Sequence, residues 1–141
     1  MKLPQAMTRP HAIAEIARRK LAGAQQFDAA VREFVDSWQM SSPSQQLACI
    51  REEPPCINAI YDAYLAALAE HLALSAKIPA PDWTEGPSRF LKEPHFAGGL
   101  ESLKPILLVE SPLAFRRRLI FISANALSRP HQTGDRIAAD A

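Results

Sequence analysis

Proline is the residue that most constrains how this chain can fold, because it lacks a backbone N–H and interrupts helices. The 141 residues include twelve prolines and only five glycines. Apolar residues recur at steps of three and four over 13–24, 26–39 and 57–76, as in helices with one buried face. Gly23 is suited either to end the first of these helices or to bend it. The spacing therefore predicts an all-α fold with five to seven helices.

Serine–proline pairs indicate where two shorter helices begin. Ser42 is suited to be an N-cap with proline following at the first helical position, which predicts a helix that runs to about Glu53. Ser111 has the same relation to a helix expected from 112 to about 119. Residues 119–122 also favour β structure, so one short strand near 119–123 stays open as an alternative.

The segment 78–99 has too many prolines and glycines for a long helix. A structureless loop of that length is unusual in a compact domain, so we expect an ordered but irregular proline-rich crossing. Its expected anchors are apolar: Trp83, Phe90, Leu91 and Phe96. A further helix is expected over 100–110.

Length and composition favour one domain. Of the residues, 48% are hydrophobic, and the formal net charge is +1. We expect a flexible arm over 1–10, one helical domain over 11–128 with N-terminal helices at 11–53 and a C-terminal half at 57–128, and a disordered tail over 129–141. The side chains expected to be largely buried are Phe27, Val31, Phe34, Trp38, Ile60, Tyr64, Leu68, Leu72, Leu107 and Phe115.

Several functional classes are disfavoured by the same numbers. The charge is too balanced for a strongly basic nucleic-acid coat, and no apolar run reaches the ~20 residues of a membrane-spanning helix. The start of the chain lacks the pattern of a secretory signal, and two cysteines do not make a disulfide framework, so a cytoplasmic location is expected. Phosphate-binding loops and metal-ligand spacings are missing, so neither a cofactor nor a metal site is expected.

Candidate catalytic residues are few. Cys56 follows a proline at an expected helix start, where the helix dipole could lower the pKa of its thiol, and Cys49 lies nearby. His71 could act as a general base held by Glu70. The cysteines are better explained as small buried hydrophobic residues, and His71 as a histidine at the edge of the core bonded to a backbone carbonyl.

Arginines form the densest polar feature of the sequence. Three of them occupy 116–118, and on a helix such neighbours fan through about 200°, so they cannot all face one ligand. At least one is expected to pair inside the molecule, for instance with Glu101 or Glu110. A second basic cluster covers 18–20.

The C-terminal part of the chain resembles a group of small uncharacterised bacterial proteins. Some of those proteins carry an N-terminal helix-turn-helix, and they are encoded next to nucleotidyltransferase-like proteins in the manner of toxin–antitoxin pairs. The resemblance covers roughly residues 57–127, whereas the first 56 residues depart from it and show no clear helix-turn-helix. The matching motifs are Ala66-Ala67-Leu68-Ala69-Glu70-His71-Leu72, Pro81-x-Trp83, Arg89-Phe90-Leu91-x-x-Pro94-x-Phe96, Gly99-Leu100-x-x-Leu103 and Glu110-Ser111-Pro112-x-x-Phe115-Arg116-x-Arg118-x-Ile120-Phe121-Ile122.

The resemblance implies a non-catalytic, antitoxin-like protein that binds a toxin or nucleotidyltransferase-like partner encoded nearby. Aromatic and arginine side chains dominate binding hot spots, which selects the expected contact residues. These residues are Trp83, Arg89, Phe90, Phe96, Arg116, Arg117 and Arg118. One alternative is a DNA-binding transcriptional regulator that uses Arg18, Arg19 and the arginine triplet. A second alternative is a small enzyme that uses His71 or Cys56.

Overall fold

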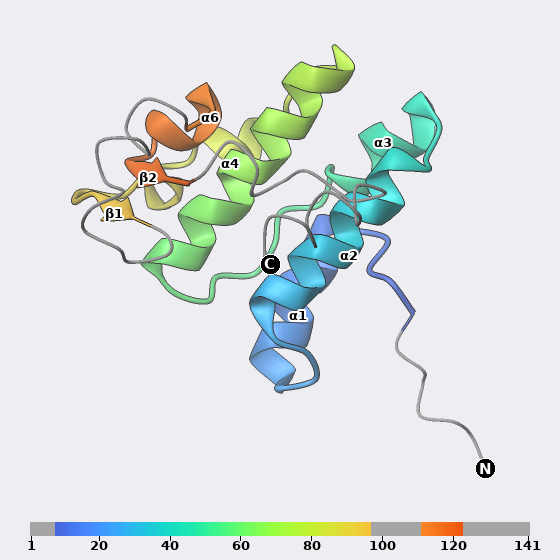
Figure 1. The fold of residues 1–141 in the computed structure, drawn as a ribbon, viewed down its shortest axis with the longest axis horizontal. Helices are drawn as coiled ribbons and strands as arrows, with labels where there is room; N and C mark the ends of the chain where they lie inside the picture. Colours follow the sequence, from blue (N-terminus) through green and yellow to red (C-terminus); the bar gives the residue numbers. More distant parts are fainter. Residues whose placement is uncertain (1–7, 97–110, 123–141) are drawn as a thin grey trace, which may run out of the picture.

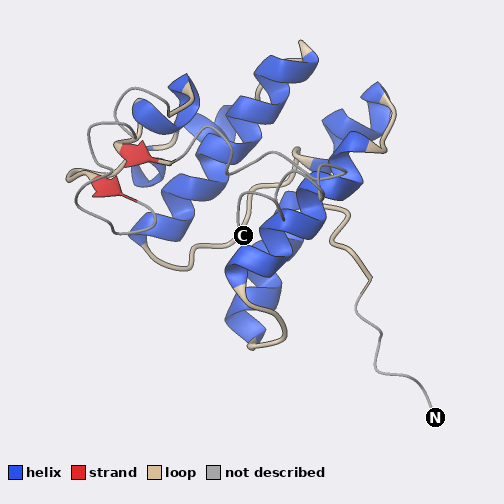
Figure 2. Ribbon diagram, viewed as in Figure 1, coloured by secondary structure: helices blue, strands red, loops and turns tan. Residues whose placement is uncertain are grey.

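The fold is mostly α-helical, as the sequence predicts. The computed structural model describes residues 8–96 and 111–122, and within them it contains five α-helices, two short 3-10 helices and one two-stranded sheet (Figure 2). The expected helix at 100–110, most of the arm and the tail lie outside the described residues. Figure 1 shows the first three helices on one side of α4, with α6 and both strands on its other side.

The N-terminal helices follow their local signals. Helix α1 (Ile13–Ala22) ends at Gly23, whose φ of 71° is the left-handed conformation that glycine adopts at little cost. Helix α2 (Phe27–Gln39) buries one apolar face against α1. Helix α3 (Pro43–Cys49) begins with the expected cap. The Ser42 hydroxyl accepts from the backbone N–H of Gln45, and the side-chain oxygen of Gln45 accepts from the backbone N–H of Ser42.

Helix α3 ends at Cys49, four residues before the expected end at Glu53. In a longer helix the carbonyl of Ile50 would accept from the N–H of residue 54, but Pro54 has none. The indole Nε1 of Trp83 donates to that carbonyl instead, at 2.9 Å. A side chain 33 residues away thus satisfies the end of the helix.

Helix α4 (Ala59–Ala76) is the central element. Asn58 caps it by accepting from the N–H of Tyr61 at 2.8 Å, so the helix starts two residues later than the expected position 57. Its middle is buried on nearly all sides, because α6 and both 3-10 helices pack on it. Lys77, with φ of 62°, ends the helix.

The expected irregular crossing forms the two short 3-10 helices and a short strand. These elements are η1 (Asp82–Glu85), η2 (Pro87–Arg89) and β1 (His95–Phe96). Strand β1 pairs in parallel with β2 (Ile120–Phe121), with His95 opposite Ile120 and Phe96 opposite Phe121. The strand alternative for 119–123 is therefore the one the chain adopts.

Helix α6 (Leu113–Arg116) is shorter than the predicted span of 112 to about 119. Leu119 has a φ of 63°, which turns the chain out of the helix and lets its carbonyl accept from the N–H of His95 at 2.8 Å. The prediction that Ser111 caps this helix is wrong. Its hydroxyl donates to the carbonyl of Ile122 and accepts from the N–H of the same residue, which fixes the end of β2.

One hydrophobic core joins both halves, with buried residues from α1, α2, α4, α6 and β2. Seven of the side chains predicted to be buried are buried: Phe27, Val31, Phe34, Trp38, Leu68, Leu72 and Phe115. Tyr64 is partly buried, and Leu107 lies outside the described residues. The prediction for Ile60 is wrong: it is 37% exposed. It lies on the first turn of α4, before Tyr64 and His71, which contact Phe115 of α6.

Among the described helices, none has the length and apolar character needed to cross a membrane.

Candidate partner-binding site

Arg89 is completely buried and therefore cannot contact a partner directly. Its Nη2 donates to the carbonyl of Pro54 at 2.8 Å and to the Glu53 carboxylate at 3.0 Å. Its Nη1 donates to the carbonyl of Asp62 at 3.2 Å, and the guanidinium lies 4.9 Å from the centre of the Trp83 ring. Arg89 and Trp83, both predicted partner contacts, together hold the 50–54 turn against α4.

Arg118 is also completely buried, although the sequence places it in the predicted contact surface. One guanidinium nitrogen, Nη1, donates to the Glu70 carboxylate and to the carbonyl of Ala114, and Nη2 donates to the carbonyl of Thr84 at 2.8 Å. Burial lowers the pKa of this guanidinium, and the hydrogen bond to Glu70 acts in the opposite direction. Arg118 is thus a structural link between α4, η1 and α6.

Arg117 lies beside it and bonds to two carboxylates. Its Nη1 is 2.7 Å from Oε1 of Glu70, and its Nη2 is 3.0 Å from Oε1 of Glu85. The hydrogen bond from Arg117 is the main cause of the lowered pKa of Glu85. Both guanidinium groups also lie over the Phe90 ring, Arg118 at 4.5 Å and Arg117 at 5.3 Å. The internal pairing expected for the triplet exists, with Glu70 and Glu85 as partners; Glu101 and Glu110 lie outside the described residues.

Arg116 and Phe96 complete the set of predicted contacts. Arg116 is exposed, whereas Phe96 is partly buried and stacks on Phe121 with ring centres 4.9 Å apart. The seven predicted contacts therefore fall into two internal clusters, Trp83 with Arg89 and Phe90 with Arg117 and Arg118, and two separate residues.

Arg18 and Arg19, two of the three basic residues of α1, form ion pairs as well. Arg18 bonds to Glu52 at 3.0 Å, and both side chains are exposed. Arg19 donates to Glu15 at 2.7 Å and to the carbonyl of Thr8. Their charges are balanced locally, which weakens the electrostatic attraction of α1 for phosphates.

Two of the candidate catalytic side chains, Cys49 and His71, are partly buried, whereas the prediction that Cys56 is buried is wrong. Burial raises the pKa of the Cys49 thiol to about 11, whereas Cys56 is exposed in the loop before α4. His71 packs edge-on against Phe115, and burial lowers its pKa. The Glu70 carboxylate bonds to Arg117 and Arg118. Within 8–96 and 111–122, no three His, Cys, Asp or Glu side chains gather as a metal site would require.

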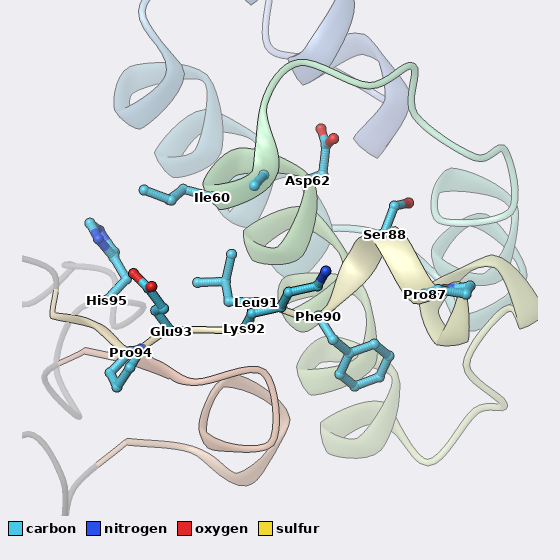
Figure 3. Close-up of a pocket in the computed structure, with 11 residues that line it drawn as sticks. Ile60, Asp62, Pro87, Ser88, Phe90, Leu91, Lys92, Glu93, Pro94 and His95 are labelled. Atoms are coloured by element: carbon cyan, nitrogen blue, oxygen red, sulfur yellow. The ribbon is translucent and has the colours of Figure 1, made fainter.

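Two neighbouring cavities at the start of α4 form a surface that the sequence did not reveal. The first, of about 770 Å³, lies between the first turn of α4 and the segment 87–95 (Figure 3). The second, of about 580 Å³, lies on the α2 side of the same turn and is lined by Phe27, Tyr61 and Tyr64 among others. Ala59, Ile60 and His95 line both cavities. We call this surface the double groove.

The helical periodicity is a misleading signal for the double groove. The three- and four-residue periodicity places Ile60 on the apolar face of α4 and so predicts burial. No residue near Ile60 in the sequence shows that the elements packed on α4 do not extend over its first turn.

Comparisons of the chain with family models, with curated proteins and with solved structures gave no match.

Proposed function

We propose that this protein is a non-catalytic, antitoxin-like binding module, whose partner is a toxin or nucleotidyltransferase-like protein encoded beside it. The observation that carries the proposal is the exposed Ile60 between two cavities on a firmly anchored helix. Concave, partly apolar surfaces on a rigid scaffold are typical binding sites. The identity of the partner rests on the resemblance of residues 57–127.

The buried arginines support this proposal indirectly. Arg89 connects η2 to α4 through the carbonyl of Asp62. Arg118 connects α4 to η1 and α6 through the Glu70 carboxylate and the carbonyls of Thr84 and Ala114. Because these bonds fix the segments that line the double groove, a partner would meet a preformed surface and lose little entropy on ordering it.

The surroundings of Cys49 and His71 favour binding over catalysis. Cys49 is a protonated thiol at neutral pH, because its pKa is raised to about 11. The carboxylate next to His71 in sequence is bonded to two arginines, so it is not available to orient the imidazole as a general base requires.

Co-expression tests the proposal. The chain carries an affinity tag, and the untagged product of the adjacent reading frame is produced in the same cells. We expect a stable complex and, if that product arrests growth, relief of the arrest. Separate elution of the two proteins together with persistent arrest would refute the proposal.

A further inference from the structure

We infer that the double groove binds a cationic, partly apolar segment of a partner protein, with an apolar side chain in the first cavity and an arginine or lysine side chain in the second. This inference rests on the proposed function and specifies the chemistry of the partner. It comes from the walls of the two cavities and from their charge.

The first cavity offers an apolar surface for a side chain of leucine size or larger. Figure 3 places Ile60, Leu91 and His95 around the space between the first turn of α4 and the segment 87–95. Pro94 adds a further apolar wall. At about 770 Å³, the space has room for more than one side chain of a bound segment.

The second cavity combines aromatic rings with a carboxylate. Phe27 and Tyr61 stack with ring centres 4.1 Å apart, and Tyr64 meets Phe27 edge-on at 5.6 Å. Asp28 lines the same cavity from the first turn of α2. Burial is the main cause of the raised pKa of Tyr64, and the negative charge of Asp28 adds to it. Within 8–96 and 111–122, the Asp28 carboxylate has neither an ion pair nor a hydrogen bond.

The charge of the lining favours a cation. Two exposed carboxylates line the two cavities, those of Asp28 and Glu93, against the single exposed ammonium group of Lys92. The Asp62 carboxylate is buried and accepts from the N–H of Ile57. The Nζ of the chain's own Lys20 lies 5.8 Å from the centre of the Tyr61 ring, near the outer limit of a cation–π contact. A guanidinium or ammonium group next to both an aromatic ring and a carboxylate gains from cation–π attraction and from ion pairing.

Short peptides test the inference without the natural partner. The chain, labelled with ¹⁵N, is titrated with the acetylated tetrapeptide amides Leu-Ser-Arg-Gly, Leu-Ser-Glu-Gly and Ser-Ser-Arg-Gly. We expect the first to shift the amide signals of Ile60, Tyr61 and His95 and to bind at least about threefold more tightly than either of the others, as one exposed cation–π or ion-pair contact allows.

Two variants locate the contact. Asp28→Asn should abolish the preference for arginine over glutamate, whereas Asp82→Asn, which neutralises an exposed carboxylate in η1, should leave it unchanged. Equal affinities for the arginine and glutamate peptides would overturn the inference. Shifts confined to other parts of the chain, or no binding of any peptide, would overturn it as well.

The co-expression experiment separates this inference from the proposed function. Ile60→Gln should weaken capture of the adjacent gene product, and Leu74→Gln serves as the control, because it changes an exposed leucine in the last turns of the same helix. If wild type captures the partner and Ile60→Gln captures it equally well, the double groove is wrong and the proposed function stands. If the peptides bind as expected but wild type captures nothing, the proposed function fails and the groove stands.

Discussion

Replacing Glu70 by glutamine should destabilise the fold far more than the same change at Glu85. Both carboxylates bond to Arg117, but Glu70 also pairs with Arg118, whose side chain is 0% exposed. Removing one member of a buried ion pair costs about 3–5 kcal/mol, because the other charge stays buried without compensation. Glu85, 3.9 Å from Arg118, compensates in part, which places Glu70→Gln near the lower end of that range, at about 3 kcal/mol.

The change at Glu85 is the matched control. Its side chain is 54% exposed, so solvent screens the pair with Arg117, and Glu85→Gln should cost less than about 1 kcal/mol. Denaturant unfolding followed by circular dichroism measures both values, and the linear slope shows whether the unfolding remains two-state.

A double variant checks the reasoning further. Exchanging both members of a buried pair for apolar side chains of similar size is often neutral or stabilising. Glu70→Leu combined with Arg118→Met should therefore recover part of the loss that Glu70→Leu causes alone. Equal losses for Glu70→Gln and Glu85→Gln would refute the view that Arg118 is a buried charge that depends on Glu70.

Three further outcomes follow from other contacts. Trp83→Phe removes the donor to the Ile50 carbonyl and should cost about 1–3 kcal/mol in the same unfolding assay, since that carbonyl loses its partner; a loss below about 0.5 kcal/mol would contradict this. Ellman's reagent at pH 8 should modify Cys56 rapidly and Cys49 slowly, because burial raises the pKa of the Cys49 thiol to about 11; equal rates would contradict it. The pKa of Glu85 is lower in the folded protein than its ordinary 4.5, so its contribution to stability is present above pH 4.5 and is lost as the pH falls below that value. Glu85→Gln should therefore reduce the acid sensitivity of the thermal midpoint below pH 4.5, and an unchanged pH profile would count against the pair.

The positions of the helices could be predicted from the sequence because they depend on residues a few places apart. The three- and four-residue spacing of apolar side chains placed α1, α2 and α4, and Gly23 and Ser42 marked the end of one helix and the start of another. The sequence alone could not decide whether a strand forms near residue 120. Its residues favour either state locally, and pairing with β1 decides between them.

The candidate site was decided by tertiary structure. Arg118 meets its partners 34 to 48 positions away, at Thr84 and Glu70, and Arg89 meets Pro54 35 positions away. Sequence patterns show that such side chains need partners, because arginine is costly to bury alone, but they do not show which partners the packed chain supplies. For the same reason Ile60 was predicted to be buried. Periodicity identifies the apolar face of a helix, whereas the burial of that face depends on how far other elements extend over it.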